Sequence, residues 1–153
     1  MPVGTYIYRT PHTVAAHETA RAAAQLMERE SIGCVVLVEE DRPVGLVTDR
    51  DIALRILGGR LDPSRVCVGE LARWPPIFVS AKASLSEAVR VMRLHRVRRV
   101  LVVDLDGKLV GLLCADDVLR LLSTEVAELA EALRKQLSGT AAVQESEYAG
   151  TAS

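Results

Sequence analysis

The stretch GLVTDRDIALRIL, residues 45–57, passes from an apolar strand into a helix within a few residues. A second stretch, GLLCADD at residues 111–117, repeats the order of a glycine, an apolar run and an acidic residue near a helix start. A glycine in such a strand allows a neighbouring segment to approach closely. In the first stretch Thr48 stands where the strand ends, and Asp51 lies in the first turn of the helix. The two stretches predict a strand-to-helix turn that occurs twice in the chain.

The rest of the chain is repeated around these turns. Val3 aligns with Val68, and the same offset is kept through Val35 and Val100. After a one-residue gap at a polar turn, the alignment continues until Asp51 meets Asp117. Because self-similarity at a fixed offset decides the architecture, the chain is predicted to be two copies of one unit.

Each copy has the same predicted order of elements. A Pro-containing stretch comes first, then a helix with apolar residues at helical spacing, which Thr19 or Ser84 caps. Two apolar strands joined by a polar turn follow, and a second helix ends the copy. The order is therefore β-α-β-β-α. The ranges are 8–14, 20–27, 34–38, 44–47 and 49–57 in the first copy, and 74–79, 85–92, 100–103, 109–113 and a helix from 116 in the second.

These elements predict an α+β fold with two repeats, 3–64 and 65–123, related by pseudo-two-fold symmetry. One such unit of about 60 residues buries too little surface to be stable alone, so the copies are expected to pack as a pair. A C-terminal helix is predicted over 124–137, because STEVAELAEALRKQL contains strong helix formers with leucines on one face. The small polar residues of 138–153 predict a flexible tail.

Composition narrows the class of protein. Lysine and arginine number 19 against 20 aspartates and glutamates, so no overall charge attracts nucleic acid or a membrane surface. No apolar run approaches the ~20 residues that cross a bilayer, and MPVGTYIYRT does not resemble a secretory signal. We therefore expect a cytoplasmic location. Three cysteines without a C-x-x-C pair predict neither disulfides nor a zinc site.

The doubled G-h-x-T-x-x-D-like pattern at residues 45–57 and 111–117 closely resembles the cystathionine-β-synthase (CBS) domain, whose tandem pair is called a Bateman module. The resemblance covers residues 3 to about 123. It implies a regulatory pair that binds AMP, ADP, ATP or S-adenosylmethionine in clefts between the repeats. It also implies dimers packed into a flat disc.

The first turn provides candidate ligand-binding residues. Backbone N–H groups at a helix start attract phosphate, and the carboxylate of Asp51 can accept ribose hydroxyls. Thr48 adds a hydroxyl and Arg50 a cation at the same turn. The alternative is that Thr48 or Asp49 only caps the helix and that Asp51 complements the helix dipole.

The second turn departs from the pattern. It keeps the acid, Asp117, but has Cys114 and Ala115-Asp116 where the first has Thr48 and Asp49-Arg50. A hydroxyl and a cation are lost, and a carboxylate is gained. By the resemblance this second site is degenerate or suited to a less anionic ligand; alternatively, Asp117 is only a helix N-terminal charge.

A second group of cations precedes the strand at 100–103. In relatives a basic pair at this position reaches the phosphates, which by resemblance assigns Arg98 and Arg99 to the ligand. A guanidinium suits phosphate oxygens. The alternative is a solvated helix face, which is also the reading for Arg90, Arg93 and Arg96.

Catalytic and metal-binding patterns are absent from the sequence. It contains no Walker motif, no G-x-G-x-x-G and no H-E-x-x-H, and its histidines are scattered. We therefore expect no enzyme and no cofactor, but a stand-alone homodimeric module that binds an adenosyl ligand and signals to an effector protein. A ligand-free dimerisation module is the alternative, and a nucleic-acid binder that uses residues 90–99 is a further one.

Overall fold

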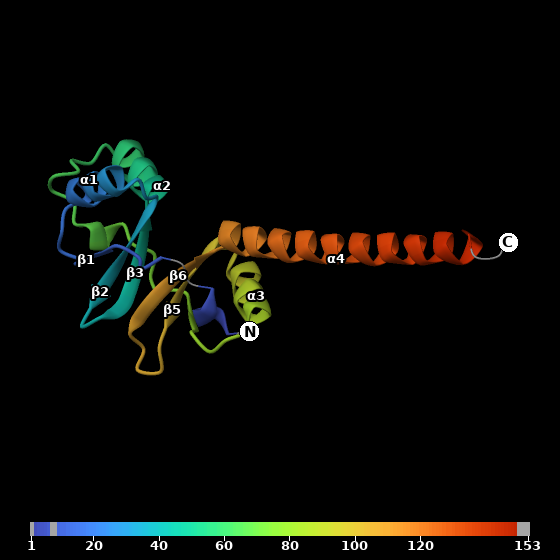
Figure 1. Cartoon of the computed structure of the whole chain (residues 1–153). Helices are drawn as coiled ribbons and strands as arrows, with labels where there is room; N and C mark the ends of the chain where they lie inside the picture. The colour runs from blue at the N-terminus through green and yellow to red at the C-terminus, as the bar shows by residue number, and fades with distance from the viewer. Residues whose placement is uncertain (1, 7–8, 150–153) are drawn as a thin grey trace. The chain divides into compact units, whose positions relative to one another are not determined.

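The computed structural model describes residues 2–6 and 9–149, so part of the predicted stretch 8–14 lies outside the described residues. The chain divides into two compact units, residues 1–115 and 116–153 (Figure 1). The first unit holds both three-stranded sheets, and the second holds most of the C-terminal helix.

The first repeat forms one sheet with the order β1-β2-β3. β1 (Thr13–Val14) runs parallel to β2 (Cys34–Glu39), and β2 pairs antiparallel with β3 (Arg42–Thr48). The helix α1 (Ala20–Glu30) joins β1 to β2. After β3, α2 (Asp49–Ile52) continues directly into a π-helical turn, η2 (Ala53–Leu57).

The second repeat has the same topology. Its sheet has the order β4-β5-β6, formed by β4 (Phe78–Ser80), β5 (Arg99–Val103) and β6 (Leu109–Cys114), with α3 (Leu85–His95) between β4 and β5. In both sheets the antiparallel register shifts at the matching point, Leu37/Val38 and Val102/Val103. The predicted α+β fold with a repeated β-α-β-β-α unit is confirmed.

The helices α1 and α3 begin at the predicted caps. The Thr19 hydroxyl accepts the Ala22 N–H at 3.1 Å, and the Ser84 hydroxyl accepts the Glu87 N–H at 3.1 Å. Both helices end at a left-handed residue, Ser31 in α1 and Arg96 in α3. The next N–H then bonds a carbonyl one turn back, which satisfies the end of the helix.

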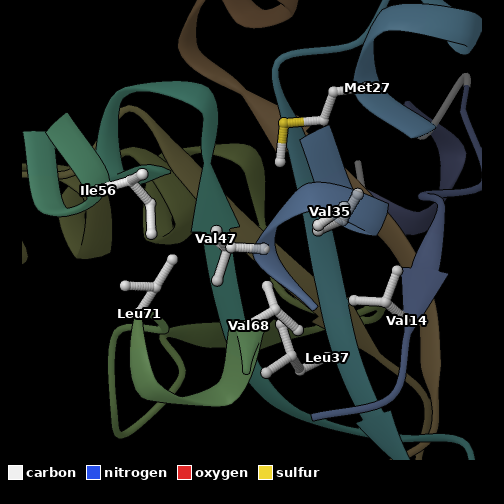
Figure 2. Close-up of a cluster of buried hydrophobic side chains, with 10 residues drawn as sticks. Val14, Met27, Val35, Leu37, Val47, Ile56, Val68 and Leu71 are labelled. Atoms are coloured by element: carbon white, nitrogen blue, oxygen red, sulfur yellow. The ribbon is translucent and has the colours of Figure 1, made fainter. Parts of the chain in front are cut away.

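The buried cluster of the first repeat includes residues of the second. Figure 2 shows Val35, Leu37 and Val47 of the sheet facing Val68 and Leu71, and all five are nearly inaccessible to solvent. Burial of such side chains contributes about 1.5–3 kcal/mol each. A segment of the second repeat therefore helps to close the core of the first.

This sharing is reciprocal. The turn η1 (Val3–Thr5) bonds to the second repeat, where the Val3 N–H donates to the Ala83 carbonyl at 2.7 Å. The turn η3 (Val68–Glu70) bonds to the first repeat, where the Val68 N–H donates to the Glu18 carbonyl at 2.7 Å. Each repeat thus holds the first turn of the other. The repeat boundaries 3–64 and 65–123 stay a prediction. In the structure, the first turn of each repeat bonds to the other repeat.

The second unit is helical. α4 (Ala115–Ala149) starts before the predicted residue 124 and continues through 138–149, which the sequence assigned to the tail. The alanine, glutamine and glutamate of that segment have enough helix propensity to extend the helix. Residues 150–153 of the predicted tail lie outside the described residues. The apolar stripe of α4 is exposed: it consists of Leu119, Leu122, Val126, Leu129, Leu133 and Leu137.

Among the described residues, no helix combines the length and the hydrophobicity that a membrane span requires. The predicted cytoplasmic location stays a prediction.

Candidate functional site

The first predicted turn is a capping box. The Thr48 hydroxyl accepts the Asp51 N–H at 3.1 Å, and the Asp51 Oδ2 accepts both the Thr48 N–H at 3.0 Å and the Thr48 hydroxyl at 2.9 Å. The capping role that the sequence left open for Thr48 is therefore present. Only 14% of the Asp51 side chain is exposed, so its carboxylate is held in one orientation at the end of β3.

The other carboxylate oxygen of Asp51 faces Arg73, a residue that the sequence did not predict to be part of the site. The Arg73 Nη2 lies 3.5 Å from the Asp51 Oδ1. Arg73 belongs to the segment between η3 and β4, residues 71–77, which we call the crossing segment. Its backbone N–H donates to the Leu46 carbonyl of β3 at 3.2 Å. This antiparallel bridge between Leu46 and Arg73 brings a distant cation to the first turn.

The crossing segment lies against β3 at Gly45, where the sequence predicted a close approach. A Cβ at this position would lie 3.0 Å from the Ala72 Cβ and 3.7 Å from the Trp74 Cε2. The Trp74 indole donates to the Gly69 carbonyl at 3.0 Å, although 53% of the residue is exposed. Gly45 therefore provides the space through which the crossing segment reaches Asp51.

Arg99 approaches the same turn from the second repeat. A Cβ at Gly33 would lie 3.7 Å from the Arg99 Nη2 and 3.5 Å from the Asp49 Oδ2. The Asp49 N–H donates to the Gly33 carbonyl at 3.0 Å, which places α2 next to this glycine. Because Gly33 has no side chain, the guanidinium of Arg99 comes close to the start of α2.

The thiol of Cys34 lies in the same electrostatic environment. Burial raises the pKa of the Cys34 thiol above its ordinary value of 9.0, Arg99 lowers it, and the acidic groups of Cys114 and Asp49 raise it. Burial has the largest effect, so Cys34 holds its proton and behaves as a small apolar side chain.

Two cavities lie near these side chains, and Asp49 lines the first of them. One of about 720 Å³ lies between α1 and the α2/η2 helix and is mainly apolar, with Met27, Ile52 and Ile56 in its lining. The other, of about 330 Å³, lies at the hairpin ends of the two repeats and is lined by Asp41, Lys108 and others. The lining of neither cavity includes a predicted site residue. Within residues 2–6 and 9–149, no group of three or more His, Cys, Asp or Glu is arranged to hold a metal ion.

Comparison with known families matches both repeats. The family model of the CBS domain matches residues 3–58 and again residues 68–124. This chain belongs to the CBS domain family. The predicted resemblance is confirmed, and the first unit together with the start of α4 is a tandem pair of CBS domains.

Relatives in the family include proteins of similar length. Hypoxic response protein 1 of Mycobacterium tuberculosis H37Rv is 43% identical over 108 residues, which are 70% of this chain and 75% of that protein. A crystal structure of Hypoxic Response Protein I with two coordinated zinc ions is 38% identical, with a TM-score of 0.71 over 78% of this chain and 98% of the other. The CBS domain protein PAE2072 from Pyrobaculum aerophilum, complexed with AMP, is 32% identical, with a TM-score of 0.70 over 76% and 89% of the two chains.

The remaining predicted residues of the CBS pair are less closely gathered. Arg50 is exposed on α2, where its N–H donates to the Asp49 Oδ1 at 2.8 Å. Arg98 is also exposed, and its carbonyl accepts the Ala115 N–H at 2.8 Å. Asp117 lies in the second unit, where its Oδ1 is 3.9 Å from the Arg120 Nη1 of the same helix.

The turn of the first CBS repeat holds Thr48 and Asp51, Arg73 of the second repeat faces Asp51, and Arg99 of the second repeat lies near Asp49. The ligand-binding roles of Thr48, Arg50, Asp51, Arg98, Arg99 and Asp117 stay predictions. Sequence reasoning missed Arg73 because its approach to Asp51 depends on the crossing segment. The repeat offset pairs this arginine with Tyr8, next to Arg9, so comparison of the two copies does not single it out either.

Proposed function

We propose that this CBS pair binds an adenine nucleotide such as AMP at the turn from β3 to α2 of the first repeat. The observation that carries the proposal is the carboxylate of Asp51, fixed by Thr48 on one oxygen while its other oxygen faces the cation of Arg73. The 32% identical relative whose structure holds AMP supports the same class of ligand.

The groups at this turn match the parts of a nucleotide. A carboxylate oxygen accepts a ribose hydroxyl, and guanidinium groups bind phosphate through charge-assisted hydrogen bonds. Arg99, close to Asp49, provides one such group near the turn. ADP, ATP and S-adenosylmethionine share the adenosine part with AMP and belong to the same proposed range of ligands.

We assign the protein a regulatory role rather than a catalytic one. The groups gathered at the turn recognise a ligand, and neither a cofactor nor a metal ion is part of the proposal. In this account ligand binding changes the surface that an effector protein contacts, and the effector provides the output. The alternative is a CBS pair without ligand, which works only through its contacts with other chains.

A ligand screen by thermal unfolding tests the proposal. The full chain is heated with AMP, ATP, S-adenosylmethionine or NAD, each at several concentrations. Ligand at 100 times its Kd stabilises the folded state by about 2.7 kcal/mol, so the midpoint should rise with concentration for AMP or a related ligand. No rise with any adenosyl compound would contradict the proposal. A salt-sensitive gel shift with DNA or RNA would instead support the nucleic-acid binder.

We also propose that the protein is a homodimer. The apolar stripe of α4 is exposed, with Val126 at 66% and Leu129 at 61%, and the wall between α1 and η2 holds a largely apolar cavity. Exposed apolar surface of this extent marks an interface, and two-fold pairing is the common way to close one. Light scattering should give twice the chain mass of 16.6 kDa. A mass of one chain at micromolar concentration would refute the dimer, and truncation after Ser123 tests whether α4 takes part.

A further inference from the structure

The carboxylate of Asp51 has one oxygen left for a ligand. Its Oδ2 already accepts two hydrogen bonds, from the N–H and the hydroxyl of Thr48. Its Oδ1 faces the Arg73 Nη2 at 3.5 Å. A carboxylate oxygen accepts about two hydrogen bonds, so a ribose hydroxyl that reaches Asp51 must approach Oδ1. Arg73 faces this same oxygen.

Arg73 is fixed at its backbone and exposed at its tip. The backbone N–H bonds to the Leu46 carbonyl, and the neighbouring residue Ala72 packs against Gly45. The side chain, by contrast, is 64% exposed, against 14% for Asp51. An ion pair of this length at such exposure contributes little to stability. The guanidinium can therefore leave Asp51 at small cost while the crossing segment stays in place.

Resting on the proposed function, we propose that Arg73 makes the first site selective for ligands that carry phosphate. When a nucleotide binds, the guanidinium moves from Asp51 to the ligand phosphate, and the freed Oδ1 accepts a ribose hydroxyl. A nucleoside without phosphate competes with Arg73 for Oδ1 and offers the guanidinium no new anion. Arg73 therefore favours the nucleotide and disfavours the nucleoside.

The two copies differ at this position. At the exact repeat offset, Tyr8 of the first copy corresponds to Arg73 of the second, and tyrosine carries no charge at neutral pH.

The test compares AMP with adenosine by titration calorimetry on the full chain. Arg73→Gln should weaken AMP binding about tenfold, the loss of one charge-assisted hydrogen bond, and should leave adenosine binding unchanged or up to about fivefold tighter. Arg73→Lys keeps the charge and should retain most of the preference for AMP. Opposite or unequal effects on the two ligands distinguish selectivity from a structural role, which would weaken both equally.

Arg55→Gln is the matched control. This variant also removes one positive charge near the site. The exposed Arg55 guanidinium donates to the carbonyl of Glu70, the last residue of η3, at 3.4 Å. Its AMP affinity should stay within about twofold of the wild type, because long-range effects of exposed charges are screened. Equal losses for AMP and adenosine in Arg73→Gln, or no loss for AMP, would overturn the role of Arg73. If the wild-type chain binds neither ligand, the proposed function itself fails.

Discussion

The two strand-to-helix turns have the same backbone and different side chains. In the first, the Asp49 N–H donates to the Gly33 carbonyl at 3.0 Å, and in the second the Ala115 N–H donates to the Arg98 carbonyl at 2.8 Å. The strand pairs next to them also match, Cys34 with Thr48 and Arg99 with Cys114. Positions that the repeats share therefore determine the fold.

Positions that the repeats do not share determine the chemistry of each turn. Thr48 fixes the Asp51 carboxylate at 2.9 Å, whereas the acid of the second turn, Asp117, pairs with Arg120 at 3.9 Å. Arg99 occupies the strand position that Cys34 has in the first repeat, and it lies next to Gly33. The second repeat thus provides a cation for the first turn, and in our account the two turns differ in ligand affinity.

The largest effect on stability is expected where the first turn of one repeat packs against the other repeat. At Gly69 a Cβ would lie 2.9 Å from the Ala16 carbonyl oxygen, and at the equivalent Gly4 it would lie 3.1 Å from the Ala81 carbonyl oxygen. Gly69→Ala should therefore lower the free energy of unfolding by about 1–3 kcal/mol, and Gly4→Ala by less. Urea unfolding measures both.

Gly58→Ala is the control for these glycine variants. A Cβ there has nothing within 4 Å, and the residue has φ −66°, which alanine readily adopts. Its free energy of unfolding should be equal to or slightly above that of the wild type. The account of the exchanged turns would be wrong if Gly4→Ala cost more than Gly69→Ala.

Exchange of the two cap residues tests the difference between the turns. Thr48→Cys removes the hydroxyl that bonds the Asp51 N–H and carboxylate, and should lower the free energy of unfolding by about 1 kcal/mol. Cys114→Thr gives the second turn the same T-x-x-D sequence and should raise the free energy of unfolding by a few tenths of a kcal/mol. Equal losses in both variants, measured by urea unfolding, would contradict the assigned difference.

The pH dependence at Cys34 gives the smallest predicted effect. Burial raises the pKa of this thiol in the folded chain, so the unfolded chain ionises first as the pH rises through 9.0. The stability that the neutral thiol contributes is complete below that pH and is lost as the pH approaches the raised pKa. Between pH 8 and pH 10.5, the free energy of unfolding should therefore fall less in Cys34→Ala than in the wild type. Cys67→Ala is the control for the removal of a thiol elsewhere. An identical pH dependence in Cys34→Ala and the wild type would contradict burial of the thiol.

The fold could be predicted from the sequence because local signals determine it. Apolar spacing placed α1 and α3, and the hydroxyls of Thr19 and Ser84 placed their first residues. Thr48 and Asp51 could be predicted as neighbours, since both belong to one turn. The contact between Arg73 and Asp51 could not, because it depends on how the crossing segment pairs with Leu46, far from it in the sequence. The extension of α4 past residue 137 was missed because small polar residues are compatible with both a tail and a helix.

Calorimetric titration of AMP into Asp51→Ala and Asp117→Ala tests the central claim most directly, that the first turn dominates ligand binding. Loss of the Asp51 carboxylate removes a hydrogen bond to a charged group, so the binding free energy should weaken by about 1.5–3 kcal/mol. Asp117→Ala should bind AMP with nearly the affinity of the wild type. Equal losses in the two variants, or a larger loss in Asp117→Ala, would contradict the account.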